Sequence, residues 1–259
     1  MKNKKILQYI YGPVSSWRLG ASLGIDPLSR VEKICSFDCV YCQLGKTKIF
    51  SSEREIYVPT DRIICELNRL PHLEIDYLTF AGRGEPTLAE NLGEMIETLK
   101  QQRKEKIAVI SNSSLIGRED VRRDLMAADF VLLKLDVCSQ LLLKDVNNPV
   151  AGIKFESIIE GIKKFKAKFH GKLGIQIMFI ELNSERAEEI AKIVRRFNAD
   201  EVEINTPLRP CGVKPLNKKE LDKIKKYFKG MNALSVYDVK KKKVEPISTD
   251  ETLIRRGKI

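Results

Sequence analysis

The chain has 259 residues, of which 43% are hydrophobic, and a formal net charge of +11. This length predicts one large domain with a substantial core. No run approaches 18 apolar residues, so we expect no transmembrane helix and no membrane partner. The basic N-terminal stretch has too short an apolar run for a signal peptide. We therefore expect a cytoplasmic protein whose six cysteines stay reduced, which excludes a disulfide framework.

The first predicted elements are an irregular segment and a short strand. Residues 11–20 are predicted to form an ordered loop, because Gly12-Pro13 followed by two serines interrupts regular structure. Residues 21–25 are predicted to be the first strand, which ends at Asp26-Pro27. The loop after this strand carries the most informative motif of the chain.

Three cysteines, Cys35, Cys39 and Cys42, follow at the spacing C-x3-C-x2-C, close enough to bind one metal centre together. A cluster held only by protein normally takes four cysteines, and structural zinc takes four Cys or His ligands. Three cysteines therefore favour a [4Fe-4S] cluster with one iron open to a cofactor or substrate. The alternative is a zinc knuckle with a distant fourth ligand, but neither histidine, His72 or His170, stands at finger spacing.

A helix over 61–70 and a strand over 75–80 come next. Cys65 in this helix is interpreted as a small core residue rather than a ligand. The strand runs directly into the loop Gly82-Arg83-Gly84-Glu85-Pro86. Its two glycines allow close approach of the backbone to a ligand, and its proline stiffens the far side. Loops at the C-terminal ends of strands are where α/β folds bind ligands.

The remaining chain alternates between helices and strands. Helices are expected over 89–101, 119–128, 155–169, 183–197 and 218–229, and strands over 107–110, 130–136, 173–180, 201–204 and 235–239. This alternation predicts a parallel sheet of about six strands. Periodicity alone does not distinguish a closed barrel from an open doubly wound sheet.

Polar residues at the strand ends are candidates for ligand contacts. Ser111 and Asn112 begin a polar cluster able to bind ribose or carboxylate groups. Lys134 and Asp136 fall on the same side of their strand because side chains alternate with period two. For Asp136, a strand-end cap and a direct cofactor contact are equally compatible with the sequence. Cys211, in a loop with two prolines, is either a hydrogen donor or thiol relay, or a packing residue.

The C-terminal region is strongly basic. Residues 217–259 contain 13 Lys and Arg but 6 Asp and Glu, a net charge of +7. This polarised charge favours an RNA partner, and a solvated lysine-rich face is the alternative. The candidate nucleic-acid contacts are a helical stripe and the run after it, namely Lys219, Lys223, Lys226, Lys240, Lys241, Lys242 and Lys243.

The cysteine spacing, with Tyr41 just before the last cysteine, and the Gly82–Pro86 loop resemble the radical S-adenosylmethionine superfamily. The resemblance covers roughly residues 10–215, the usual size of such a core. It implies a partial (β/α)6 TIM-like barrel, in which the open iron of the [4Fe-4S] cluster chelates S-adenosylmethionine. An electron, from a donor such as a flavodoxin or ferredoxin, then cleaves this cofactor to methionine and a 5′-deoxyadenosyl radical.

The same resemblance implies roles for individual residues. Tyr41 is expected to lie against the adenine, and Gly82, Gly84, Glu85 and Pro86 to form the segment that binds the amino group of the cofactor. Arg83 stands where the family often has glycine. Further cofactor contacts are expected at the strand ends, from Ser111, Asn112, Lys134 and Asp136.

Within the superfamily the sequence is similar to a small group related to the tRNA wyosine-base synthases. Those synthases carry upstream cysteines for a second cluster, whereas this chain has no cysteine before Cys35. We expect an enzyme that modifies a tRNA base. The alternatives are radical modification of a small molecule or protein side chain, and a non-catalytic iron-sulfur protein that binds nucleic acid. Residues 1–217 are expected to form the core, with residues 218–259 packed on the same domain.

Overall fold

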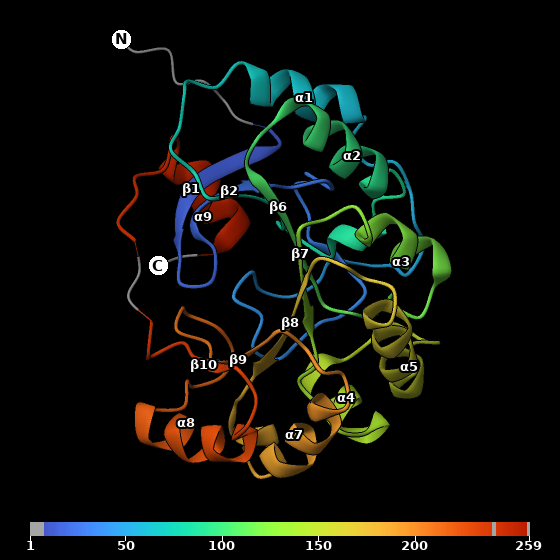
Figure 1. The fold of residues 1–259 in the computed structure, drawn as a ribbon, viewed down its shortest axis with the longest axis vertical. Coiled ribbons are helices and arrows are strands. Elements are labelled where there is room, and N and C mark those ends of the chain that lie inside the picture. Colours follow the sequence, from blue (N-terminus) through green and yellow to red (C-terminus); the bar gives the residue numbers. More distant parts are fainter. Residues whose placement is uncertain (1–7, 240–241, 258–259) are drawn as a thin grey trace.

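An eight-stranded sheet with the order β1-β2-β5-β6-β7-β8-β9-β10 is the frame of the computed structural model, which describes residues 8–239 and 242–257. The sheet curls into an open arc with most helices on its outer side (Figure 1). Its strands are β1 Ile10–Ser16, β2 Gly20–Ile25, β5 Tyr77–Phe80, β6 Lys106–Ser111, β7 Phe130–Lys134, β8 Lys172–Met178, β9 Glu201–Asn205 and β10 Ala233–Ser235. Two short strands, β3 Ile34–Cys35 and β4 Ile49–Phe50, pair separately.

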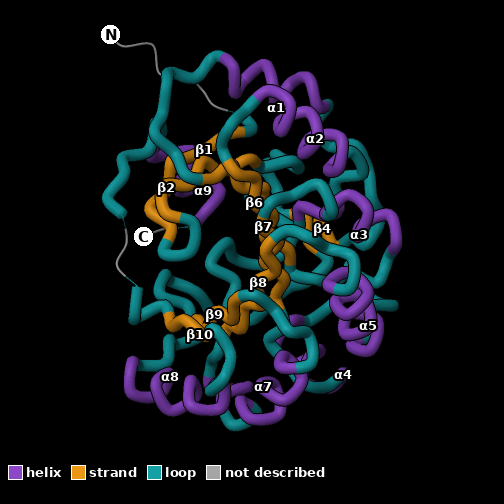
Figure 2. Tube along the Cα trace, viewed as in Figure 1, coloured by secondary structure: helices purple, strands orange, loops and turns teal. Residues whose placement is uncertain are grey.

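Most of the helices connect successive parallel strands across the outer face, as the tube view shows (Figure 2), whereas the last helix follows the last strand. They are α1 Thr60–Asn68, α2 Leu92–Gln102, α3 Glu119–Leu125, α4 Gln140–Asn147, α5 Phe155–Lys166, α6 Glu181–Ser184, α7 Ala187–Arg195, α8 Lys218–Lys225 and α9 Thr249–Arg256. Short 3-10 turns, η1 Pro86–Leu88 and η2 Lys226–Phe228, complete the set. From β2 to β9 the strands pair only in parallel, which confirms the predicted partial (β/α)6 barrel.

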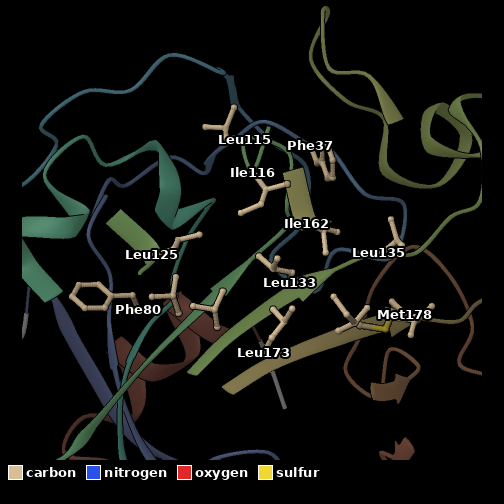
Figure 3. Close-up of a cluster of buried hydrophobic side chains, with 14 of the residues drawn as sticks. Phe37, Phe80, Leu115, Ile116, Leu125, Leu133, Leu135, Ile162, Leu173 and Met178 are labelled. Atoms are coloured by element: carbon tan, nitrogen blue, oxygen red, sulfur yellow. The ribbon is translucent and has the colours of Figure 1, made fainter. Parts of the chain in front are cut away.

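The core fills the space between the sheet and its outer helices (Figure 3). The apolar run Phe130–Leu133 of β7 is buried throughout, as expected for a parallel strand covered on both faces. Leu173 on β8 and Ile162 on α5 belong to the same core cluster as Leu133. Full burial of one such side chain contributes about 1.5–3 kcal/mol to the free energy of unfolding. Because these side chains lie on the strands themselves, their packing holds in place the strand ends that carry the site.

The N-terminal segment differs from the prediction. Residues 10–16 are not a loop but the edge strand β1, antiparallel to β2. The pairing register shifts between Tyr11 and Val14, and the intervening Gly12 has a φ of 94°. Proline is tolerated at a bulge of an edge strand, where its missing N–H breaks no interior ladder.

Two helix predictions also need correction. Cys65 is exposed, because α1 buries Ile63 and Leu67 rather than the face that contains the cysteine. The helix predicted from Asn183 is broken into α6 and α7. The buried Asn183 amide donates to the carbonyls of Asp136 and Met178 at 2.8 and 2.9 Å, so it serves the strand ends rather than a longer helix.

The C-terminal segment forms a helix that the sequence analysis did not predict. Helix α9 packs against β1, and Thr252 accepts a hydrogen bond from the Gly12 amide at 3.1 Å. In Figure 1 it lies inside the open arc, beside β1 and β2. None of the helices formed by the described residues is long and apolar enough to span a bilayer.

Candidate active site

The cysteine loop is docked between two parts of the barrel mouth. Ile34 forms a parallel bridge with Gly84 of the glycine loop, just before Cys35. On the other side, the Val40 amide donates to the Val146 carbonyl of α4 at 3.0 Å. Within the loop, the Cys42 amide donates to the Cys39 carbonyl at 2.9 Å. Backbone hydrogen bonds therefore hold the loop on both sides.

Each cysteine sulfur has a nitrogen donor nearby. Asn112 Nδ2 lies 3.5 Å from Cys35 Sγ, and Asn147 Nδ2 lies 3.3 Å from Cys39 Sγ. Lys33, itself 3% exposed, places Nζ 3.0 Å from Cys42 Sγ. Hydrogen bonds to sulfur stabilise thiolate ligands and tune iron-sulfur sites. The donor set therefore fits an iron-sulfur centre held by these three sulfurs.

Burial acts in the opposite direction on the free thiols. It raises the pKa of Cys35 to about 12, helped by the charge of Glu85, and it raises the pKa of Cys39. The free Cys35 thiol therefore stays protonated at neutral pH, and binding of a metal centre would displace its proton. In the described part of the chain, no three His, Cys, Asp or Glu side chains converge closely enough to hold one metal ion. The fit of these residues to an iron-sulfur cluster therefore rests on the three sulfurs and the nitrogen donor beside each of them.

The Tyr41 hydroxyl joins a buried polar network. It donates to Asp136, and it accepts from Lys134 Nζ at 2.9 Å and from Asn147 Nδ2 at 3.0 Å. Lys134 and Asp136 share one side of the strand, as period two predicted, with 3.7 Å between Nζ and Oδ2. Asp136 also accepts from the Met178 amide at 2.7 Å. This bond gives Asp136 the strand-end role, while a direct cofactor contact stays a prediction.

The glycine loop packs tightly against its neighbours. A Cβ at Gly84 would lie 1.8 Å from the Ile34 carbonyl oxygen, and one at Gly82 would lie 2.3 Å from Asp26 Cγ. The protein's own contacts are thus sufficient to require glycine at both positions. The cofactor contact expected from the sequence stays a prediction. Pro86 begins the 3-10 turn η1 that closes the loop.

Glu85 ties this loop to the next strand end. Its side chain is buried and accepts from Ser111 Oγ at 2.8 Å and from the Asn112 amide at 2.7 Å. Thr87 donates from its amide and hydroxyl at 3.1 and 2.7 Å. Burial raises the pKa of Glu85, although these hydrogen bonds oppose the shift. Hydrogen bonds of Glu85 to Ser111 and Asn112 therefore hold the glycine loop against the end of β6. Direct contacts of these three residues with the cofactor stay predictions.

A cavity of about 480 Å³ opens beside the cysteine loop, within the arc of the barrel. Its lining includes Gly82, Gln43 next to Cys42, and the inward side chains Gln176 and Asn205 of β8 and β9. Sequence analysis missed the polar residues of this cavity. The alternation of Glu201, Glu203 and Asn205 along a short strand was the available signal.

Glu203 lies fully buried beside this cavity. Arg18 Nε and Gln176 Nε2 each lie 2.6 Å from its Oε2, whereas its Oε1 has no hydrogen-bond partner. Burial raises the pKa of Glu203 from 4.5 to about 7, against the opposing charge of Arg18. A carboxyl group that titrates near neutrality therefore lies close to the cavity.

The remaining predicted residues lie away from the cavity lining. The Cys211 thiol is half-buried and donates to the Val213 carbonyl at 3.3 Å. Lys219, Lys223 and Lys226 are exposed, opposite the buried face of α8 and η2. Lys242 pairs with Asp76 at 3.2 Å, and Lys243 is exposed. Lys240 and Lys241 lie outside the described residues.

This fold is a partial (β/α)6 barrel with a three-cysteine loop at its mouth, and comparisons identify its class. The model of the Radical SAM superfamily matches residues 31–194. A UPF0026 protein of Synechocystis sp. is 40% identical over 210 residues, which are 81% of this chain and 78% of the relative. The chain therefore belongs to the Radical SAM superfamily and is a radical S-adenosylmethionine enzyme. Membership implies an iron-sulfur cluster and S-adenosylmethionine.

Solved structures share the fold at low sequence identity. TYW1 with a lysine-pyruvate adduct bound superimposes with a TM-score of 0.60 at 19% identity, covering 80% of this chain and 72% of that one. SuiB of Streptococcus suis bound to S-adenosylmethionine gives a TM-score of 0.61 at 15% identity, covering 84% of this chain and 50% of that one. At these identities the likeness concerns the fold alone.

Proposed function

We propose that Cys35, Cys39 and Cys42 hold a [4Fe-4S] cluster and that the enzyme modifies a base of RNA, in particular of tRNA. The observation that carries the cluster assignment is the nitrogen donor beside each of the three sulfurs. When bound, the cluster supplies the electron that cleaves S-adenosylmethionine to methionine and a 5′-deoxyadenosyl radical. We expect a flavodoxin or ferredoxin in the cytoplasm to deliver this electron.

The chain's own residues orient the site. The bridge between Ile34 and Gly84 keeps the cysteine loop against the glycine loop, which we expect to bind the amino group of the cofactor. Glu85 aligns this loop with the end of β6. The network around the Tyr41 hydroxyl fixes the ring next to Cys42, on the side where we expect the adenine.

The cluster assignment is tested by anaerobic reconstitution of the full chain and single cysteine variants. Cys39→Ala should lose the iron-sulfur absorbance, bound iron and the formation of 5′-deoxyadenosine with dithionite as the reductant. Cys65→Ala is the matched control, because Cys65 is exposed on α1. Full iron content and turnover in Cys39→Ala would refute the assignment.

The RNA proposal is supported by the exposed lysine stripe on α8 and η2. Each phosphate contact contributes roughly 0.7–0.9 to the slope of log affinity against log salt. Replacing the three stripe lysines by glutamine should therefore lower the slope for tRNA by about 2–3. The matched control neutralises three exposed lysines on other outer elements, namely Lys144, Lys164 and Lys168. If both triple variants show the same slope of log tRNA affinity against log salt, the stripe is a solvated face and does not contact tRNA.

A small-molecule substrate is the second candidate. The cavity of about 480 Å³ favours it, because this volume is typical of sites for small ligands. Formation of 5′-deoxyadenosine that increases with added nucleotide but not with added tRNA would support this candidate over the first.

A further inference from the structure

The cavity beside the cysteine loop is strongly basic. Four of the described residues that line it are arginines, namely Arg18, Arg209, Arg255 and Arg256. No Asp or Glu is among the described lining residues. They come from distant parts of the chain: the β1–β2 turn, the loop after β9, and α9. Figure 1 shows α9 inside the arc, beside β1 and β2. The two arginines of its last turn line the cavity together with residues of the β1–β2 turn.

Two of these arginines have carboxylate partners. Arg18 Nε lies 2.6 Å from Glu203 Oε2, and Arg255 Nε lies 3.5 Å from Asp26 Oδ2. Arg255 also pairs with Glu251 one turn earlier in α9. The positive charges of Arg18 and Arg255 are therefore paired with carboxylates of the protein, and they give no reason to expect a bound anion.

Arg209 and Arg256 are different. Within residues 8–239 and 242–257, neither guanidinium has an ion-pair partner. Arg209 Nε donates to Gln43 Oε1 at 2.5 Å, and its Nη1 donates to the Arg256 carbonyl. Arg256 Nη2 reaches the Ser15 carbonyl at 3.4 Å. These neutral acceptors orient the two side chains and leave further N–H groups of each guanidinium for a ligand.

Two uncompensated cations beside one cavity are unfavourable without an anion. Burial and the neighbouring charges of Arg256 and Arg18 lower the pKa of Arg209 to about 10. Burial likewise lowers the pKa of Arg256. A bound anion would offset both effects, since buried charges in proteins are normally paired. The arrangement of these two guanidinium groups therefore favours binding of a negatively charged group.

The position of this pair indicates that the anion belongs to a ligand bound in the cavity. Gln43, which holds Arg209, directly follows Cys42, so the two guanidiniums lie beside the cluster loop. Gly82 lines the same cavity, and Trp17 adds a planar surface, with the Arg18 guanidinium 4.7 Å from its ring centroid. A volume of about 480 Å³ accommodates a nucleotide-sized group.

We propose that Arg209 and Arg256 bind a phosphate group of the substrate, so that the enzyme acts on a nucleotide, either free or within an RNA strand. The inference rests on the proposed function and adds a defined anion subsite to it. Guanidinium groups suit this role because their paired N–H donors match two phosphate oxygens. A competing occupant is the carboxylate of S-adenosylmethionine.

The test measures equilibrium binding to the reconstituted, full-length protein under anaerobic conditions. The probes are uridine 5′-monophosphate, uridine, tRNA and S-adenosylmethionine. The variants are Arg209→Gln, Arg256→Gln and the charge-conserving Arg209→Lys. The control is Arg196→Gln, which removes an exposed arginine at the C-terminal cap of α7. Thermal unfolding of each variant separates loss of binding from loss of the fold.

We expect the wild type to bind the monophosphate at least tenfold more tightly than uridine. Arg209→Gln and Arg256→Gln should each weaken binding of the monophosphate at least tenfold, Arg209→Lys less, and Arg196→Gln not at all. The affinity for S-adenosylmethionine should change less than twofold. If tRNA affinity falls together with that for the monophosphate, the phosphate belongs to the strand. If only the monophosphate is affected, the substrate is a free nucleotide.

Two results would overturn the proposal. One is unchanged binding of both phosphate probes in the folded Gln variants. The other is a tenfold loss of S-adenosylmethionine affinity with no loss for either phosphate probe, which would give the arginines to the cofactor. A failure of the proposed radical chemistry is seen separately, as absence of 5′-deoxyadenosine from the wild-type protein, and does not change these binding measurements.

Discussion

Gly84 offers a sharp test of how the cysteine loop is positioned. In Gly84→Ala the new Cβ would lie 1.8 Å from the carbonyl oxygen of Ile34 and 2.9 Å from Leu28 Cδ1. Because the first of these atoms belongs to the backbone, rotation of a side chain cannot relieve the clash. The separation must grow to about 3.0 Å or more, so the two loops must part by at least about 1.2 Å.

The expected cost follows from this displacement. Overpacking of this kind costs about 1–3 kcal/mol, and a chain of this size loses roughly 2–4 °C in Tm per kcal/mol. A shift of about 1 Å at a reacting site also costs about 100-fold in rate. We therefore expect Gly84→Ala to lower the Tm, to retain less iron after reconstitution and to form 5′-deoxyadenosine about 100-fold more slowly.

Thermal unfolding, iron analysis and product chromatography measure these three effects. Gly45→Ala is the control in the neighbouring cysteine loop, since its Cβ would meet no atom within 4 Å, although its φ of 80° adds backbone strain. A Gly84→Ala protein with the Tm, iron content and turnover of the wild type would contradict the proposed packing of the two loops.

Three further changes probe the site. Tyr41→Phe removes a buried hydroxyl with three partners and should lower the free energy of unfolding by about 1–3 kcal/mol, whereas Tyr227→Phe, at an exposed ring, should not; equal denaturation curves would argue against the network. In the folded state the pKa of Glu203 is raised to about 7, so its contribution to stability falls as the pH rises from about 4.5 to 7. As the pH rises from 5 to 8, the stability of Glu203→Gln should therefore increase relative to that of the wild type. A difference in Tm that does not change with pH would refute this. Cys211→Ser should cleave S-adenosylmethionine and form the modified product at the wild-type rates, because the thiol contacts a backbone carbonyl away from the cavity lining; unchanged cleavage with loss of the modified product would instead assign it the relay role.

Local patterns predicted much of the barrel. The buried run Phe130–Leu133 and the amphipathic faces of α5 and α7 depend on neighbours within a few residues, so periodicity identified them. The common side of Lys134 and Asp136 followed from the pleat of one strand. The edge strand β1 was missed because Pro13 was read as a break, although pairing with β2 tolerates it at a bulge.

The cavity could not be predicted in the same way. Arg18, Arg209 and Arg256 lie far apart in the sequence, and only the closure of the arc brings them together. The role of Glu85 also depends on a neighbouring strand, since its partners Ser111 and Asn112 end β6. The count of charges showed that the last 43 residues are basic. It could not predict that two of these residues, the arginines at the end of α9, line the cavity.

The end of α9 has a practical consequence for handling the protein. Gly257 closes the helix so tightly that a Cβ there would lie 2.2 Å from the Gln43 carbonyl oxygen, one residue from Cys42. Two residues of chain span at most about 7 Å, so an affinity tag fused after Ile259 would begin close to the cysteine loop. A polyhistidine sequence placed there could capture iron during reconstitution and inflate the measured metal content. Tags are better attached at the N-terminus, ahead of residue 8, or removed before iron is added.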